Sequence, residues 1–221
     1  MNLASFNLTQ QTLGFLDTVL ERSPQMLRMV IDEFCDIHRP RDSNAHQVRE
    51  PSVTALGEEP LDMQTLSQRV MRNRTLVEQS YVASLREQLG SSVMDGEWAS
   101  ANLLARRPPA TVRISKEEVH ALVLRIEKVC QHELSEISAL LYTLDLASPD
   151  QSKRSPISPT IFVFALRDSI TQVMETNQSA TLLFKGLSLQ YALAMRYEYL
   201  WCLGSLKAMH GFRQSGLQDL I

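Results

Sequence analysis

The chain has 221 residues, of which 44% are hydrophobic and 6% aromatic, which fits one large or two small globular domains. With 8 glycines and 9 prolines it has few turn residues for an all-β protein, and its side chains favour helices over strands. The formal charge of −3 and the pI near 6.0 provide no net attraction to phosphate backbones or anionic membranes, so we expect no nucleic-acid partner.

The cysteines indicate a reducing compartment. Cys35, Cys130 and Cys202 are odd in number, widely spaced and set among apolar residues, which is typical of reduced, buried thiols. The first residues lack the basic segment and apolar core of a secretion signal, and charged residues interrupt the richest apolar stretch, 191–209. We therefore expect a cytoplasmic protein without an integral membrane segment.

Residues 1–38 are predicted to form an N-terminal helical hairpin. The first helix begins near residues 7–9, whose polar side chains can cap it, and ends near Glu21. Ser23 then caps a second helix that has Pro24 in its first turn, where the missing amide proton costs nothing. Both helices carry an apolar stripe suited to packing.

Segment 39–60 is predicted to be a linker. It contains several prolines, a glycine and charged residues, with no apolar period of either the helical or the strand kind. Such a polar connection leaves open whether the hairpin packs on the rest of the chain. It also leaves open the role of its basic residues, Arg39 and Arg41.

A helical core domain is predicted over 61–212. Its first helix runs from residues 62–65 to Leu89, where apolar residues recur at helical spacing, and Gly90 is expected to end it. A short helical turn follows at 97–104. The two prolines within 105–111 then break regular structure, because they lack the amide donor.

The strongest helix start lies at Ser115. Its hydroxyl can accept from the amide of Glu118 while the Glu118 carboxylate reaches back to the Ser115 amide, which is a capping box. One long helix is expected to follow as far as Leu144, since apolar residues advance by threes and fours on a single stripe. The stripe consists of Val119, Val123, Ile126, Cys130, Leu134, Ile137, Leu141 and Leu144.

The last two helices follow a double-proline turn. Ser158 is the expected cap of the first, with Pro159 in its first turn, and this helix is predicted to end near Asn177. The final helix is predicted over 179–211, stopped by Gly211, and residues 213–221 are expected to form a flexible tail.

These elements predict an all-α fold, a multi-helix bundle of about six helices. The C-terminal helix carries apolar residues around most of its circumference, so it is expected to be largely buried by the others. This helix has more apolar residues than five neighbouring helices can necessarily cover. In that case a patch remains for self-association or for a protein partner.

The order of elements resembles a helical proteobacterial family of unknown function, sometimes mislabelled as thymidine phosphorylase. The resemblance is carried by the Ser-Pro-Ile-Ser-Pro turn at 155–159, by Leu-Leu-Phe-Lys at 182–185, and by the leucine-rich helix 132–141 upstream. Phe162, Ala165, Leu166, Tyr197, Leu200, Leu203 and Gly211 also match. The resemblance implies an all-helical bacterial protein, a short member without the C-terminal extension of longer ones, and it carries over no catalytic residue.

Two motifs were weighed as metal sites. Cys35 and His38 are separated by two residues, with His46 nearby, and Cys130 and His132 are separated by one. A structural zinc site needs four convergent ligands, usually as two closely spaced pairs, and the second spacing does not fit one helical face. We expect no metal.

Catalytic signatures are missing from the sequence. It contains no Gly-x-Ser-x-Gly elbow, and no cysteine has a local active-site signature beside a plausible base. The glycines are scattered singly, so neither of the common phosphate-binding loops can be formed. We expect no cofactor and no enzymatic activity.

Two functional hypotheses remain. The first is a non-enzymatic helical interaction or regulatory protein that acts through protein–protein contacts or self-association. The alternative is a small-ligand or nucleotide-sensing helical module with a polar cavity around the C-terminal helix. Its speculative ligand-binding residues are Lys185, Arg196, Glu198, Tyr191 and Tyr197. The charges among them either line this cavity or pair with other charges and reach solvent, because an unpaired buried charge is costly.

Overall fold

The computed structural model describes residues 3–39, 62–93, 112–143 and 157–218, and every regular element in these ranges is a helix. This confirms the all-α prediction. The helices are α1 (Leu3–Ile37), α2 (Met63–Arg72), α3 (Arg74–Val93), α5 (Lys116–Val129), α6 (Gln131–Thr143), α7 (Pro159–Val173) and α8 (Asn177–Gln218). None of these helices combines the length and the apolar content that crossing a bilayer requires.

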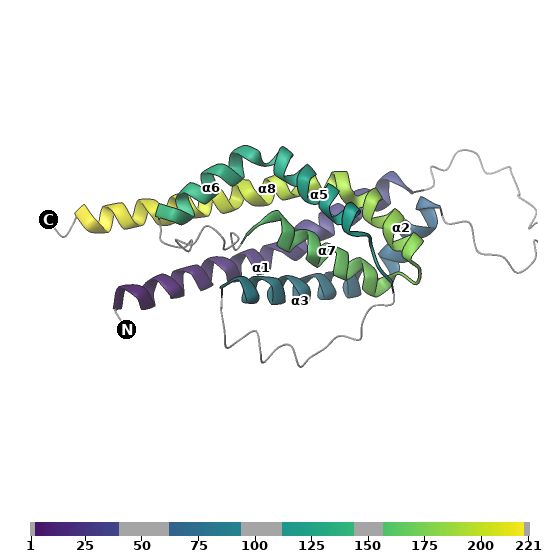
Figure 1. The fold of residues 1–221 in the computed structure, drawn as a ribbon, viewed down its shortest axis with the longest axis horizontal. Helices are drawn as coiled ribbons and strands as arrows, with labels where there is room; N and C mark the ends of the chain where they lie inside the picture. Colours follow the sequence, from purple (N-terminus) through teal and green to yellow (C-terminus); the bar gives the residue numbers. More distant parts are fainter. Residues whose placement is uncertain (1–2, 40–61, 94–111, 144–156, 219–221) are drawn as a thin grey trace, which may run out of the picture.

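The bundle is built around α8, which has 42 residues and packs against α1, α2, α5, α6 and α7. Figure 1 shows α1 and α8 running antiparallel along the molecule, so that the start of α1 and the end of α8 lie at the same end. Helix α3 packs mainly on α7 and on α1. The hairpin region therefore packs on the core, a question that the sequence left open.

The predicted hairpin is wrong, because α1 is one helix of 35 residues with Pro24 inside it. The buried row of α1 continues through the proline at helical spacing, through Leu16, Val19, Ser23, Met26, Val30 and Phe34. Ser23 does not cap a new helix; its hydroxyl donates to the carbonyl of Val19 at 2.7 Å. Packing on both sides of Pro24 thus outweighs the ~3 kcal/mol that an interior proline costs.

Two other predicted helices are each divided in the structure. Asn73 separates α2 from α3, and its backbone amide and side-chain amide both donate to the carbonyl of Arg69. Cys130 separates α5 from α6 with φ of −108° and ψ of 18°. An asparagine side chain can compete with the helical hydrogen bonds of the backbone, so Asn73 is compatible with a break. The sequence near Cys130 contains no residue that indicates one.

Helix starts were predicted better than helix ends. Asp62, Ser115 and Ser158 are the N-caps of α2, α5 and α7, as expected. The Ser115 hydroxyl accepts from the Glu118 amide at 3.2 Å, although the Glu118 carboxylate pairs with Lys185 of α8. Ser158 occupies its position without a side-chain cap hydrogen bond.

The predicted ends at Gly90, Asn177 and Gly211 are wrong. Helix α3 continues to Val93 and α8 to Gln218, because glycine permits a left-handed end but does not impose one. Helix α7 ends at Val173, and Asn177 begins α8.

The start of α8 is secured by a reciprocal cap. Thr176 Oγ1 accepts from the Ser179 amide at 3.1 Å, while Ser179 Oγ accepts from the Thr176 amide at 3.3 Å. Three predicted segments lie outside the described residues: the linker apart from Arg39, the turn at 97–104 and the proline pair within 105–111.

The predicted apolar stripes face the core. On α5 and α6 the row from Val119 to Leu141 is buried apart from Leu134, which is partly buried. On α8 one glycine marks a close approach: a Cβ atom at Gly186 would lie 2.8 Å from the Phe34 ring and 2.7 Å from Met63. Helices α1, α2 and α8 meet there.

Candidate functional site

The inner face of α8 holds two buried tyrosines whose hydroxyls are fully used. Tyr191 donates to the carbonyl of Phe162 at 3.0 Å, and Tyr199 donates to the carbonyl of Ile157 at 3.1 Å. Tyr81 of α3 lies 2.9 Å from the Tyr191 hydroxyl. Because the proton of Tyr191 is committed to Phe162, Tyr81 is the donor in that contact. Burial raises the pKa of Tyr191 and Tyr199, so these hydroxyls stay neutral and tie α8 to its neighbours.

The flank of α8 that faces α5 and α6 carries a row of cations, each paired. Lys185 lies 2.8 Å from Glu118, Arg196 lies 2.9 Å from Glu133, and Lys207 lies 2.7 Å from Glu136. The three cations are spaced by eleven residues, or about three helical turns, so they project from the same side of α8. Intramolecular pairing neutralises this flank.

The opposite flank, toward α1, buries a looser charge pair. Glu198 lies 3.5 Å from Arg22 of α1, whose guanidinium also sits 4.4 Å from the centroid of the Trp201 ring. Trp201 in turn stacks on Phe15 of α1. Desolvation raises the pKa of Glu198 above its ordinary value, and Arg22 offsets only part of that rise.

Between these flanks the outer face of α8 stays open and apolar. Its four large exposed side chains are Leu189 (54% exposed), Leu193 (48%), Tyr197 (70%) and Leu200 (46%). Their spacing of four, four and three residues places them in one row. We call this row the outer stripe. It shows that the described helices leave part of the apolar surplus of α8 exposed.

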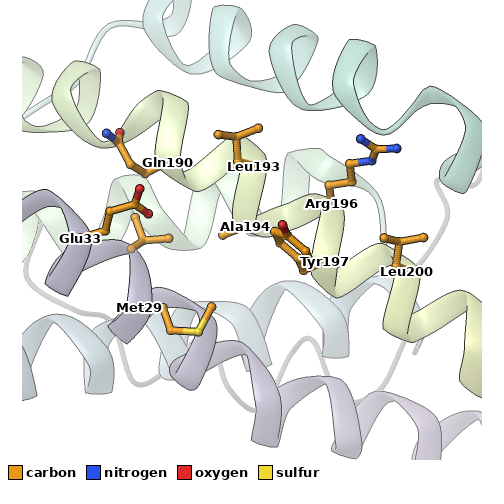
Figure 2. Close-up of a pocket in the computed structure, with 9 residues that line it drawn as sticks. Met29, Glu33, Gln190, Leu193, Ala194, Arg196, Tyr197 and Leu200 are labelled. Carbon is orange, nitrogen blue, oxygen red and sulfur yellow. The ribbon is translucent and has the colours of Figure 1, made fainter.

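A groove of about 350 Å³ runs between the outer stripe and α1. Figure 2 shows Met29 and Glu33 of α1 on one side, and Gln190, Leu193 and Tyr197 of α8 on the other. Val30, Ala194, Arg196 and Leu200 complete its lining. The side-chain oxygen of Gln190 is buried and has no hydrogen-bond partner among the described residues. The groove is thus mainly apolar, with one unused acceptor.

The five residues proposed for a ligand site do not converge. Arg196 and Tyr197 line the groove, and Arg196 is also held by Glu133. Tyr191 is enclosed on the inner face, Glu198 is buried beside Arg22, and Lys185 is bound to Glu118. The charged members therefore follow the second of the two interpretations, pairing with other charges.

The sequence did not single out the residues that define the groove. Leu189, Leu193 and Leu200 were predicted only as apolar residues of α8, with Leu200 also part of the family resemblance, and Met29 was not considered. Their regular spacing was visible in the sequence. Which side of α8 lacks a covering helix depends on the arrangement of α1 and α6, which only the structure provides.

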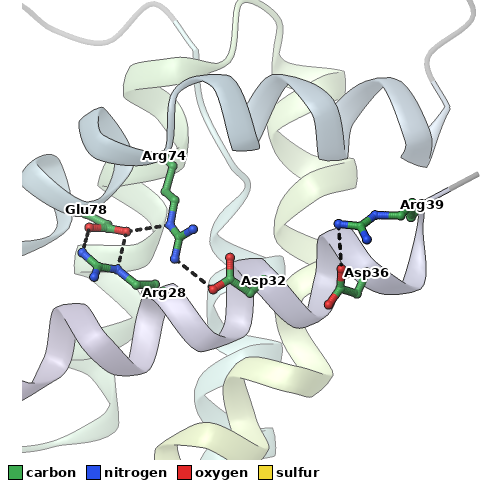
Figure 3. A network of polar contacts seen from close by, with 6 residues as sticks. All are labelled: Arg28, Asp32, Asp36, Arg39, Arg74 and Glu78. Atoms are coloured by element: carbon green, nitrogen blue, oxygen red, sulfur yellow. Dashed lines mark hydrogen bonds and ion pairs between the residues drawn. The ribbon is translucent and has the colours of Figure 1, made fainter.

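A separate polar network joins α1 to α3 (Figure 3). Glu78 accepts from Arg28 at 2.7 Å and from Arg74 at 3.0 Å, and Arg74 also reaches Asp32 at 2.9 Å. These hydrogen bonds lower the pKa of Glu78, first through Arg28. Every member of this network has a partner, which fits a structural role.

The metal-ligating types are dispersed. Within the described ranges, no three His, Cys, Asp or Glu side chains are grouped as a metal ion would need. Cys35 donates to the carbonyl of Ser67, and His38 packs on Phe34; His46 lies outside the described residues. Burial raises the pKa of Cys130 and of Cys202 to about 12, so neither thiol ionises readily.

Comparison with models of known protein families, with curated proteins and with solved structures finds no match to this chain. The geometry of α8 and its surroundings is therefore the basis for inferring function.

Proposed function

We propose that this chain is a non-enzymatic helical interaction protein that binds a helix of a protein partner along the outer stripe of α8. The observation that carries the proposal is the row of four exposed large apolar side chains beside an apolar groove. A continuous apolar patch on a helical surface is typical of helix-in-groove recognition, where partner side chains enter at helical spacing.

The chemistry of the surroundings supports binding rather than catalysis. Glutamates of the same chain engage Lys185, Arg196 and Lys207 of α8. The inner tyrosines are hydrogen-bonded, and the three cysteines are buried as free thiols. A nucleophile or acid–base group needs an accessible side chain with a perturbed pKa that favours reaction. In the described residues the groove offers a mainly apolar surface instead.

Three buried free cysteines also support a reducing compartment, and we place the protein in the bacterial cytoplasm on that ground and on the family resemblance. The ligand-sensing alternative has weaker support. Its five residues lie on different sides of α8, and only Arg196 and Tyr197 share a cavity. A ligand in the groove would meet mostly apolar side chains.

The test is site-specific photo-crosslinking in the cells that make this protein. A benzophenone amino acid in place of Leu193 is expected to form a covalent adduct with another polypeptide. Leu76 of α3 is the matched control, since it is 46% exposed and lies on a helix that packs on α1 and α7. An adduct at position 193 that is absent at position 76 supports the proposal. No adduct at position 193, or equal adducts at both positions, would overturn it.

A further inference from the structure

The outer stripe does not end at Leu200. It continues toward the end of α8 with exposed residues at the same spacing, but these are small: Gly204, Ala208 and Gly211. Within the described part of the chain, nothing lies within 4 Å of a Cβ atom added to Gly204 or Gly211, so these positions are open on the surface. The stripe from Leu189 to Gly211 is about 33 Å long at 1.5 Å per residue.

This extended stripe has a large half and a small half, arranged evenly about Leu200. Leu189 lies eleven residues before Leu200, and Gly211 lies eleven residues after it. Leu193 lies seven residues before, and Ala208 eight after; Tyr197 lies three before, and Gly204 four after. Each large side chain thus has a small counterpart at nearly the same distance on the other side of Leu200.

Such an arrangement is self-complementary. When two identical helices pack antiparallel about a two-fold axis, each residue faces the one equally far from the axis on the other chain. An axis at Leu200 would place Leu189 against Gly211, Leu193 against Ala208 and Tyr197 against Gly204 of the second copy. Large side chains would then enter spaces left by small ones, which is how helices pack closely.

We propose that a second copy of this chain occupies the outer stripe, forming an antiparallel α8–α8 dimer centred on Leu200. The inference rests on the proposed function and names the partner. Binding of a different helix does not depend on large and small residues lying at equal distances on either side of Leu200. In an antiparallel pair of identical helices, this arrangement places each large residue opposite a small one.

The charges beside the stripe are compatible with two copies meeting. In a two-fold arrangement the flank bearing Arg196 and Lys207 faces the same flank of the second copy. Like charges would repel there if they were bare. Each is already bound to a carboxylate of its own chain, Glu133 for Arg196 and Glu136 for Lys207, so the facing surfaces are locally neutral.

The first experiment measures mass. Light scattering and sedimentation of the purified chain should give a dimer, and Gly204→Leu should raise its dissociation constant about tenfold or more by filling the space for Tyr197. No described residue lies within 4 Å of a Cβ atom at that position, so the variant monomer should fold. Adding Tyr197→Ala to Gly204→Leu should recover much of the affinity, because the new leucine then has space. A monomeric wild-type chain, or losses that simply add in the double variant, would overturn the proposal.

The second experiment tests the register by disulfide formation under mild oxidation. Leu200→Cys should crosslink with itself at the axis. Leu189→Cys should not, but it should crosslink when mixed with Gly211→Cys. The native thiols Cys35, Cys130 and Cys202 are buried, so the wild-type chain is the blank. Equal crosslinking of Leu189→Cys alone and of the mixture would refute the register.

The two proposals fail differently. A chain that stays monomeric in solution but still forms an adduct from position 193 in cells, with a polypeptide of another mass, refutes the second copy and retains the interaction surface. The absence of both dimer and adduct refutes both.

Discussion

The inner and outer faces of α8 use similar side chains for different purposes. On the inner face Phe184, Tyr191 and Tyr199 are fully buried, and the two hydroxyls have hydrogen-bond partners. On the outer face Leu189, Leu193, Tyr197 and Leu200 are as apolar but exposed. The comparison shows that composition alone does not tell a core face from an interaction face. Coverage by neighbouring helices distinguishes the two faces.

The largest difference is expected from truncating an apolar side chain on each face. Phe184→Ala removes a ring that is 1% exposed and should lower the free energy of unfolding by about 3–5 kcal/mol, because it leaves a cavity. Leu189→Ala should change it by less than about 0.5 kcal/mol in the monomer, since half of that side chain is already in solvent. Urea denaturation at high dilution measures both. Equal losses would mean that the outer stripe is part of the core.

Removing the hydroxyl group of a buried or an exposed tyrosine should change the free energy of unfolding by different amounts. Tyr191→Phe should cost about 1–3 kcal/mol, because it leaves the buried Tyr81 hydroxyl without an acceptor. Tyr81→Phe should cost only about 0.5–1.5 kcal/mol, since Tyr191 still donates to Phe162. Tyr197→Phe, on the outer face, should leave stability unchanged. A larger loss of unfolding free energy for Tyr81→Phe than for Tyr191→Phe would contradict the assignment of Tyr81 as the donor to Tyr191.

Gly186 and Gly204 of α8 should respond to alanine with opposite signs. Gly204→Ala should stabilise the monomer by about 0.5–1 kcal/mol through helix propensity, because its Cβ atom meets no other described residue. At Gly186 the same gain is exceeded by an overpacking cost of about 1–3 kcal/mol against the buried Phe34 ring. Thermal unfolding of the two variants at equal, low concentration provides the measurement. Stabilisation by both substitutions would show that the side chains of Phe34 and Met63 can move away from the new methyl group without a net cost.

The smallest effects are expected from the carboxylates on the two flanks, where solvent screens the arginine partners. Burial raises the pKa of Glu198, so its ionisation costs stability as pH rises through the folded-state value. Glu198→Gln should therefore be more stable than the wild type at neutral pH, and this advantage should vanish below the ordinary pKa of 4.5.

Glu133 should behave in the opposite way. Desolvation raises its pKa, but the hydrogen bond from Arg196 and the arginine charge outweigh this, and the pKa is lowered overall. Its contribution to stability is present above pH 4.5 and is lost as pH falls through the folded-state pKa. Glu133→Gln should thus be less stable at neutral pH and equal to the wild type in acid. Unfolding curves across this pH range would show the opposite slopes, and parallel curves would contradict them.

Most of the fold follows from local chemistry in the sequence. Caps at Asp62, Ser115 and Ser158 mark helix starts because side-chain oxygens and proline have positional preferences that neighbours rarely change. The breaks at Asn73 and Cys130, and the continuity of α1 through Pro24, depend on what each helix packs against. Tertiary packing overrides local preference at these places.

The candidate site shows the same division. The charged residues of α8 were found from the sequence because charges in an apolar helix are conspicuous, yet Lys185, Arg196 and Glu198 each have a partner in another helix. The outer stripe was hidden among similar leucines. Its identity depends on which side of α8 is left uncovered, and that is a property of the bundle.

The pairing of α1 with α8 has a consequence for how the protein folds as it is made. Phe15 stacks on Trp201, and Phe34 lies beside Gly186, so α1 packs against a helix that is far from it in the sequence. Contacts between distant segments form slowly, because a long loop must close first. On the ribosome the buried row of α1 remains uncovered until α8, which is synthesised after it, becomes available. Chaperone binding to the nascent chain is therefore expected to persist until α8 has emerged.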